Sequence, residues 1–118
     1  MTRETGAARQ RPVLVVRPPI RVQVWPDRIW PPQRRAWGST TTMWIRATGL
    51  RLDQPEPGVI TALVLTQAGD VLCEVGFGVK VDGERHRLCL LLSASDAVMP
   101  VDDTELERLR EMIARLRR

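Results

Sequence analysis

The chain is poor in the residues that most often carry out chemistry. Its 118 residues include one histidine, two cysteines and no tyrosine. Two cysteines are too few for a disulfide scaffold or a complete zinc site. No apolar run approaches the roughly 20 residues that a membrane-spanning helix needs, and the polar N-terminus lacks the apolar segment of a secretory signal. We therefore expect no metal, no cofactor, no membrane partner and a cytoplasmic location.

The few titratable side chains do not form a catalytic motif. The single histidine, His86, has no serine or cysteine in a recognisable turn beside it, which a catalytic base would need. Asp102 and Asp103 are adjacent carboxylates, but capping of a predicted helix accounts for both. The Gly-Phe-Gly run at 76–78 lacks the strand-turn-helix context of a phosphate-binding loop. The sequence therefore predicts that the protein is not an enzyme. An enzyme that uses His86, Asp102 and Asp103 is kept as an alternative.

Acidic residues are scarce in the first part of the chain. Up to Arg51 there are ten arginines against two acids, whereas eight basic residues face twelve acids from Leu52 onward. Codon usage in a GC-rich genome explains why seventeen of the eighteen basic residues are arginine. It does not explain the missing acids. A basic half of this kind attracts nucleic acid or an acidic protein surface.

All four tryptophans lie in the segment 25–44, WPDRIWPPQRRAWGSTTTMW. Its prolines exclude a regular helix, so we expect an extended or irregular arm. Tryptophan and arginine can stack on nucleobases and neutralise phosphates, and they are equally frequent in protein–protein hot spots. An arginine can also stack on a tryptophan within the arm itself. We expect Trp25 and Trp44 to belong to the core. The predicted contact residues for nucleic acid or a protein partner are Arg28, Trp30, Arg34, Arg35, Trp37 and Arg46.

Several segments have the alternating or β-branched pattern of strands. Two strands are predicted at 13–17 and 20–25, separated by Pro18-Pro19, and another at 41–52. A β-meander follows, with strands at 59–66, 71–81 and 86–93. Gly69 is placed for a left-handed turn position, and Asp82-Gly83 is a strong hairpin signal.

A helix is predicted over 102–117. Asp102 is placed to cap it and Glu105 follows at the third helical position, as in a capping box. The apolar residues of this segment recur at helical spacing and form one stripe. The stripe consists of Leu106, Leu109, Ile113 and Leu116.

The predicted turns fix which strand residues share a face. One face carries the odd-numbered residues of 71–81, the even-numbered leucines of 86–93, and Leu65, Leu63 and Thr61. We expect the helix to cover this face. The opposite face holds Ile60, Ala62, Val64, Leu72, Cys89 and Leu91, with Glu74, Lys80 and Arg87. Gly76 and Gly78 leave a shallow trough there in which a flat ring could lie. This second face is apolar enough to need a cover, from the arm or from a second copy of the chain. Cys73 and Cys89 fall on opposite faces and are expected to be reduced.

The sequence thus predicts an α+β fold, in which an antiparallel β-meander is extended by N-terminal strands and one C-terminal amphipathic helix packs on one face. Residues 1–12 are expected to be a flexible basic tail, and 13–118 a small single domain. The first functional hypothesis is a non-catalytic, oligomeric binding module whose basic arm contacts nucleic acid. The alternative is a protein-interaction or assembly module, a small structural component or an inhibitor of a larger factor, that uses the arm and the second apolar face. A homo-oligomer is expected in either case.

Overall fold

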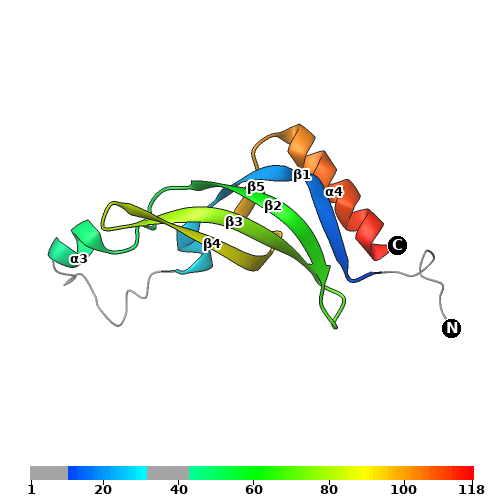
Figure 1. Ribbon diagram of the computed structural model, residues 1–118, viewed down its shortest axis with the longest axis horizontal. Helices are drawn as coiled ribbons and strands as arrows, with labels where there is room; N and C mark the ends of the chain where they lie inside the picture. The colour runs from blue at the N-terminus through cyan, green and yellow to red at the C-terminus, as the bar shows by residue number, and fades with distance from the viewer. Residues whose placement is uncertain (1–10, 32–42) are drawn as a thin grey trace.

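The computed structural model describes residues 11–31 and 43–118 (Figure 1). One antiparallel sheet of five strands, in the order β4-β3-β2-β1-β5, is followed by a long C-terminal helix. The strands are β1 (Val13–Val24), β2 (Glu56–Leu65), β3 (Val71–Val81), β4 (Glu84–Ser93) and β5 (Val98–Pro100). The helices are α1 (Pro26–Ile29), α3 (Met43–Thr48) and α4 (Asp103–Arg117). The α+β class is confirmed, and the sheet is strongly curved.

The N-terminal strand is continuous, rather than divided in two at the prolines. β1 pairs with β2 from Val13 to Val15 and again from Ile20 to Val24, and the register shifts between the two stretches. Pro18 and Pro19 lie in the interruption, where the missing N–H groups of proline cost no ladder hydrogen bonds. The prolines therefore break the pairing but leave the chain extended. The Arg17–Pro18 peptide is cis.

The strand predicted at 41–52 is wrong, because the segment contains the helix α3. The amide of Gly49 donates to the carbonyl of Ile45 at 2.7 Å, and the hydroxyl of Thr48 donates to the carbonyl of Trp44 at 2.6 Å. Local hydrogen bonds thus close this segment into turns before it can join a sheet. Trp44 is 70% exposed, so its predicted place in the core is also wrong.

The two predicted turns of the sheet are confirmed. Gly69 has a φ of 91° in the β2–β3 connection, and Asp82 and Gly83 have φ values of 53° and 77° in the β3–β4 hairpin. Positive φ at both central residues is the signature of a type I′ hairpin turn, whose twist matches that of the strands. This turn fixes the predicted register, since β3 residues 75 and 77 lie opposite β4 residues 90 and 88.

A β-bulge in β2 changes which of its residues face the core. Leu63 pairs with Cys73 as predicted, but the register shifts so that Ile60 pairs with Val75. Ile60 is therefore fully buried, and the hydroxyl of Thr61 donates to the carboxylate of Glu74 at 2.7 Å. The sequence predicted the opposite arrangement for Ile60 and Thr61. One extra residue in a strand reverses the face of every residue beyond it.

The predicted C-terminal helix is confirmed together with its cap. A carboxylate oxygen of Asp102 accepts a hydrogen bond from the amide of Glu105 at 2.9 Å. Leu109 and Leu116 are buried in one core with residues of β1, β2, β3 and β5. The helix packs against β1, β2 and β5, so it lies at the β1 end of the sheet rather than over the three strands of 56–93 alone. No helix in the described ranges is long and apolar enough to cross a membrane.

Candidate functional site

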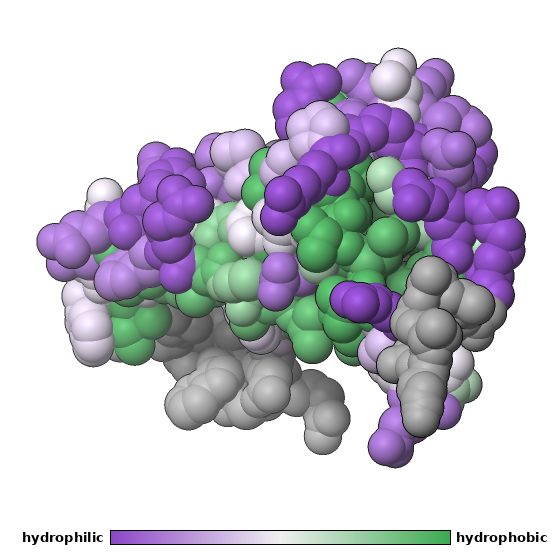
Figure 2. All heavy atoms as spheres, turned by 45° about the vertical axis from the view of Figure 1, so that its right-hand side comes forward, coloured by the Kyte–Doolittle hydropathy of each residue, from purple (hydrophilic) through white to green (hydrophobic). Residues whose placement is uncertain are grey.

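The sheet has a second face that no described element covers. Cross-strand neighbours lie on the same side of a sheet, and one such row runs from Val15 through Ala62 and Glu74 to Leu91. Val15 and Leu91 are each about half exposed, as are Val13 and Met99 on the same side. We call this side the open face. In a space-filling view, apolar side chains gather into one surface area bordered by hydrophilic ones (Figure 2).

An open groove of about 420 Å³ lies at one end of the open face. Gly58, Gly76 and Gly78 line it, and of these Gly76 leaves open space, since a Cβ built there would meet no atom closer than 3.9 Å. The trough that the sequence predicts at Gly76 and Gly78 is open at Gly76, whereas the Arg85 side chain fills it at Gly78. We call the groove the glycine groove. Its remaining lining consists of Arg21, Val22, Pro57, Val59, Phe77, Arg85, Arg87 and Val101.

The charged side chains that line the glycine groove are three arginines, two of which have carboxylate partners just outside the lining. Arg85 lies across Gly78, because a Cβ built there would be 2.6 Å from the Arg85 Nη1 atom. That nitrogen is 3.5 Å from the carboxylate of the buried Glu56. Arg87 is paired through its strand, but its side chain has no hydrogen bond or ion pair with any residue that the structure describes. It is therefore the cation most available to an incoming anion.

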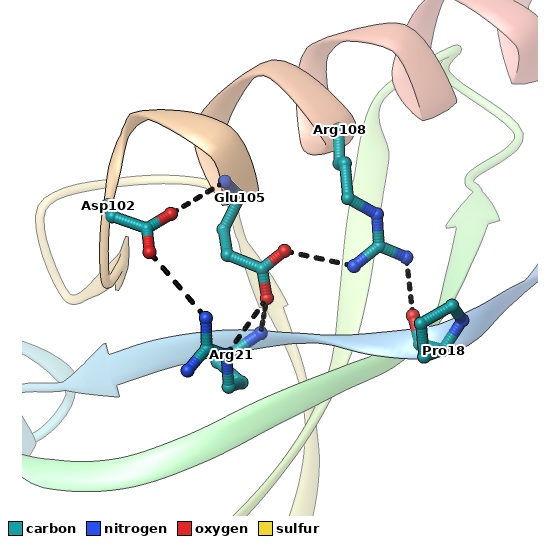
Figure 3. Close-up of polar contacts among 5 residues, drawn as sticks. All are labelled: Pro18, Arg21, Asp102, Glu105 and Arg108. Carbon is teal, nitrogen blue, oxygen red and sulfur yellow. Dashed lines mark hydrogen bonds and ion pairs between the residues drawn. The ribbon is translucent and has the colours of Figure 1, made fainter.

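The third arginine, Arg21, is fixed by the helix α4 (Figure 3). Its backbone amide donates to Glu105 Oε2 at 2.7 Å, and its guanidinium lies 3.5 Å from Asp102 and 3.4 Å from Glu105. The Arg21 side chain nevertheless remains 66% exposed to solvent. α4 therefore holds one side of the groove in place while leaving its charge accessible to solvent.

Glu105 also closes an unpaired stretch of β1. β5 pairs with residues 22–24 of β1, and the Val101 amide just after it donates to the Arg21 carbonyl at 3.1 Å, which leaves the Arg21 amide and the Pro18 carbonyl without a strand partner. The Arg21 amide donates to Glu105, while Arg108 donates to Glu105 Oε1 at 2.9 Å and to the Pro18 carbonyl. The hydrogen bond from the Arg21 amide and then that from Arg108 lower the pKa of Glu105. A charged carboxylate thus substitutes for a strand at this edge of the sheet.

Two of the predicted contact residues belong to the fold rather than to the groove. The Arg28 guanidinium lies 4.6 Å from the ring centroid of Trp25, and its Nη1 donates to the Asp96 carbonyl at 2.8 Å. This is the arginine–tryptophan stacking within the arm that the sequence allows as an alternative to external contact. The Trp30 ring lies 6.4 Å from that of Phe77, a core side chain, at an interplanar angle of 38°. Neither Arg28 nor Trp30 lines the glycine groove.

The other predicted contacts are not described by the structure. Arg34, Arg35 and Trp37 lie outside the described residues, and Arg46 belongs to α3 but its side chain is not described. The half-buried Trp25 agrees with its predicted place in the fold. Sequence reasoning placed Arg87 beside the glycine trough but did not select it. The signal was the alternation of β4, which also places Arg85 on that face.

The two cysteines lie on opposite faces of the sheet and are free, as predicted. Cys73 is buried in the core, and burial raises the pKa of its thiol from 9.0 to about 11. Cys89 is exposed and lies opposite Gly76 on the open face. The described residues contain no group of three or more histidine, cysteine, aspartate or glutamate side chains that could hold a metal ion. The groove thus offers charge, an apolar wall and an open space above Gly76.

Comparison with known proteins finds no family model, no curated protein and no solved structure that matches the chain.

Proposed function

We propose that the protein is a non-catalytic, cytoplasmic module that binds single-stranded nucleic acid in the glycine groove, with the basic arm adding contacts. The observation that supports this most directly is the combination of an apolar wall, the open space above Gly76 and three lining arginines, of which Arg87 has no side-chain partner among the described residues. Flat bases stack on apolar surfaces, and phosphates are attracted to arginine side chains.

The shape of the groove favours a single strand over a duplex. A single strand presents the faces of its bases, whereas a duplex stacks those faces internally and presents only base edges. Small-ligand sites have volumes of roughly 300–1,000 Å³, and the groove, at about 420 Å³, falls within this range. We propose that it holds one or two nucleotides, with a base against Val59 and Gly76 and a phosphate at Arg87.

The predicted contacts of the arm remain part of the proposal. Arg34, Arg35, Trp37 and Arg46 would extend the path of the nucleic acid beyond the groove. Arg28 and Trp30 already have partners within the protein, so we expect them to contribute less. The arm therefore supplies additional affinity, and the groove supplies the stacking site.

Fluorescence anisotropy of a labelled 12-nucleotide pyrimidine strand, as DNA and as RNA, tests the proposal. We expect binding that weakens as salt rises, because bound arginines displace counterions. Arg87→Ala should weaken it and reduce the dependence of log K on log salt by about one unit or less. Arg110→Ala is the matched control, since Arg110 is exposed on α4 and contacts only Glu107. Unchanged anisotropy at low salt with single strands and duplex would rule out the proposal.

The open face also supports a second candidate, a protein-interaction or assembly module. Val13, Val15, Leu91 and Met99 are exposed apolar side chains on that face. Exposed apolar patches of this kind often mark protein contacts. A protein partner would bury these residues without requiring Arg87, so Val15→Lys would weaken its binding and Arg87→Ala would not. These two variants distinguish the candidates.

A further inference from the structure

The two edges of the sheet differ in whether their backbone groups have hydrogen-bond partners. At the β1 edge, β5 pairs with residues 22–24, and Glu105 and Arg108 of α4 bond the groups that β5 leaves unpaired. At the opposite edge, no segment in the described ranges pairs with the outer side of β4. β4 is ten residues long and pairs with β3 without a bulge. A long, regular strand with a free edge is a template for another strand.

The protection usual for an edge strand is present in only half of β4. Residues 84–87 read Glu-Arg-His-Arg, and charges of this kind discourage edge-to-edge pairing. Residues 88–92 read Leu-Cys-Leu-Leu-Leu and contain neither a charge nor a proline. The leucines at 88, 90 and 92 pack at the margin of the core and are only half-buried, and Cys89 and Leu91 are exposed on the open face. Among the described residues, this half of the strand therefore has no partner on the open face or along the outer edge of its backbone.

The residue pattern of β4 is complementary to itself. In an antiparallel pair, directly opposite residues point to the same side, so two copies related by a twofold axis through the sheet pair residues whose numbers have an even sum. A centre at Leu90 places 88 opposite 92 and Cys89 opposite Leu91, and every pair in the run is apolar. A centre at Cys89 would place Arg87 opposite Leu91 and His86 opposite Leu92. The apolar pattern therefore selects Leu90 as the centre.

We propose that β4 binds β4 of a second copy of the chain, antiparallel and centred on Leu90, to form a continuous ten-stranded sheet. The pairing extends the core row of leucines across the twofold axis and covers Cys89 and Leu91 on the open face. A twofold contact uses the same edge of both copies, so this interface closes as a dimer and does not grow into a fibre. On the β1 side, β5 and α4 bond the edge groups of Pro18 and of residues 21–24. Both glycine grooves then open on the same side of the joined sheet.

Light scattering across a concentration series tests the dimer. We expect twice the mass of one chain for the wild-type protein. The double variant Cys89→Lys, Leu91→Lys puts like charges directly opposite each other in the proposed register, and we expect its dimer dissociation constant to rise at least tenfold. Both positions are exposed within one chain, so the fold should persist, which circular dichroism checks. The matched control is Val13→Lys, Val15→Lys, which adds the same charges to exposed sites on the distant strand β1 and should leave the dimer intact.

Disulfide trapping tests the register. Leu91→Cys places its thiol directly opposite Cys89 of the second copy, at a distance that a disulfide can bridge, whereas two Cys89 residues are only diagonal neighbours. We expect mild oxidation to give a covalent dimer of this variant several times faster than of the wild type. A monomer at all concentrations overturns the proposal, and so does a dimer unaffected by the double lysine variant. Neither result depends on nucleic acid, so this test is independent of the proposed function.

Discussion

Glu105 accepts a hydrogen bond from the backbone amide of Arg21 at 2.7 Å, although the two residues are 84 positions apart. The contact joins the first turn of α4 to β1 just after the interruption in its pairing with β2. It also fixes the backbone of an arginine that lines the glycine groove. The stability of the sheet edge and the geometry of the groove thus depend on the same carboxylate.

We expect Glu105→Gln to lower the melting temperature at neutral pH. The pKa of Glu105 is below its ordinary value of 4.5 in the folded chain, so its charge stabilises the fold above that pH. This stabilisation is lost as the pH falls through the lower, folded-state pKa. The difference in melting temperature between the wild type and the variant should therefore become smaller in acid. Thermal unfolding from pH 3 to pH 7 measures it. Glu107→Gln, exposed and paired only with Arg110, should change little at any pH.

We expect Trp30→Ala to destabilise the protein by about 1–3 kcal/mol, less than the loss for a fully buried tryptophan. The Trp30 ring packs against Phe77 and has 36% of its surface exposed. Trp44→Ala is the matched control, since Trp44 is 70% exposed, and it should change the unfolding free energy by less than about 0.5 kcal/mol. Urea denaturation compares the two. Equal losses would show that Trp30 has no part in holding α1 to the core.

We expect the two thiols to react with a disulfide reagent at very different rates. Cys89 is exposed and Cys73 is buried with its pKa raised to about 11. A pKa two units above 9.0 alone lowers the thiolate fraction near pH 8 about a hundredfold. Because the unfolded thiol ionises near pH 9 and the folded one only near pH 11, burial of the neutral Cys73 thiol contributes fully to stability below pH 9. This contribution is lost as the pH rises from 9 toward 11. We expect the disulfide reagent to release one equivalent of its reporter group from the native protein and two equivalents in urea. Rapid release of two equivalents without urea would contradict the prediction that Cys73 is protected.

Much of the sheet could be predicted because its signals are local. Asp82-Gly83 defines a hairpin turn, and a turn of known type sets the register of β3 and β4 without reference to the rest of the chain. The cap of α4 is equally local, since Asp102 and Glu105 are three residues apart. The glycine trough followed from the same register, so its position was predictable while its third arginine, on β1, was not.

Two of the errors arise from long-range structure, and the error at 41–52 arises from local hydrogen bonds. The bulge at Thr61 has no mark in the sequence of β2, because it fits that strand to the curvature of a sheet formed by distant segments. The segment 41–52 carries both helical and extended signals, and the hydrogen bonds of α3 decide between them. The partner of Glu105 is 84 residues away, so no spacing rule could have identified it.

Filling the groove should separate binding from stability. A Cβ at Gly76 would meet no atom closer than 3.9 Å, so Gly76→Val fits the strand and projects into the groove. Glycine inside a strand lowers the stability of the fold by roughly 0.5–1 kcal/mol relative to alanine. We therefore expect the unfolding free energy of Gly76→Val to be unchanged or slightly higher, while its oligonucleotide binding falls at least tenfold. We expect Gly69→Ala to do the opposite. Its φ of 91° strains any side chain, so the variant should unfold more easily, while oligonucleotide binding should be unchanged because Gly69 does not line the groove. Parallel urea and anisotropy titrations of both variants would show this.

The most direct test of the glycine groove is a nuclear magnetic resonance titration of ¹⁵N-labelled protein with a short pyrimidine oligonucleotide. We predict that the amide signals of Gly76, Gly78 and Arg87 shift progressively, since these residues line the groove. Signals of Glu107 and Glu111, on the exposed side of α4, should remain in place. Shifts confined to residues outside the groove, or no shifts at low salt, would contradict the account.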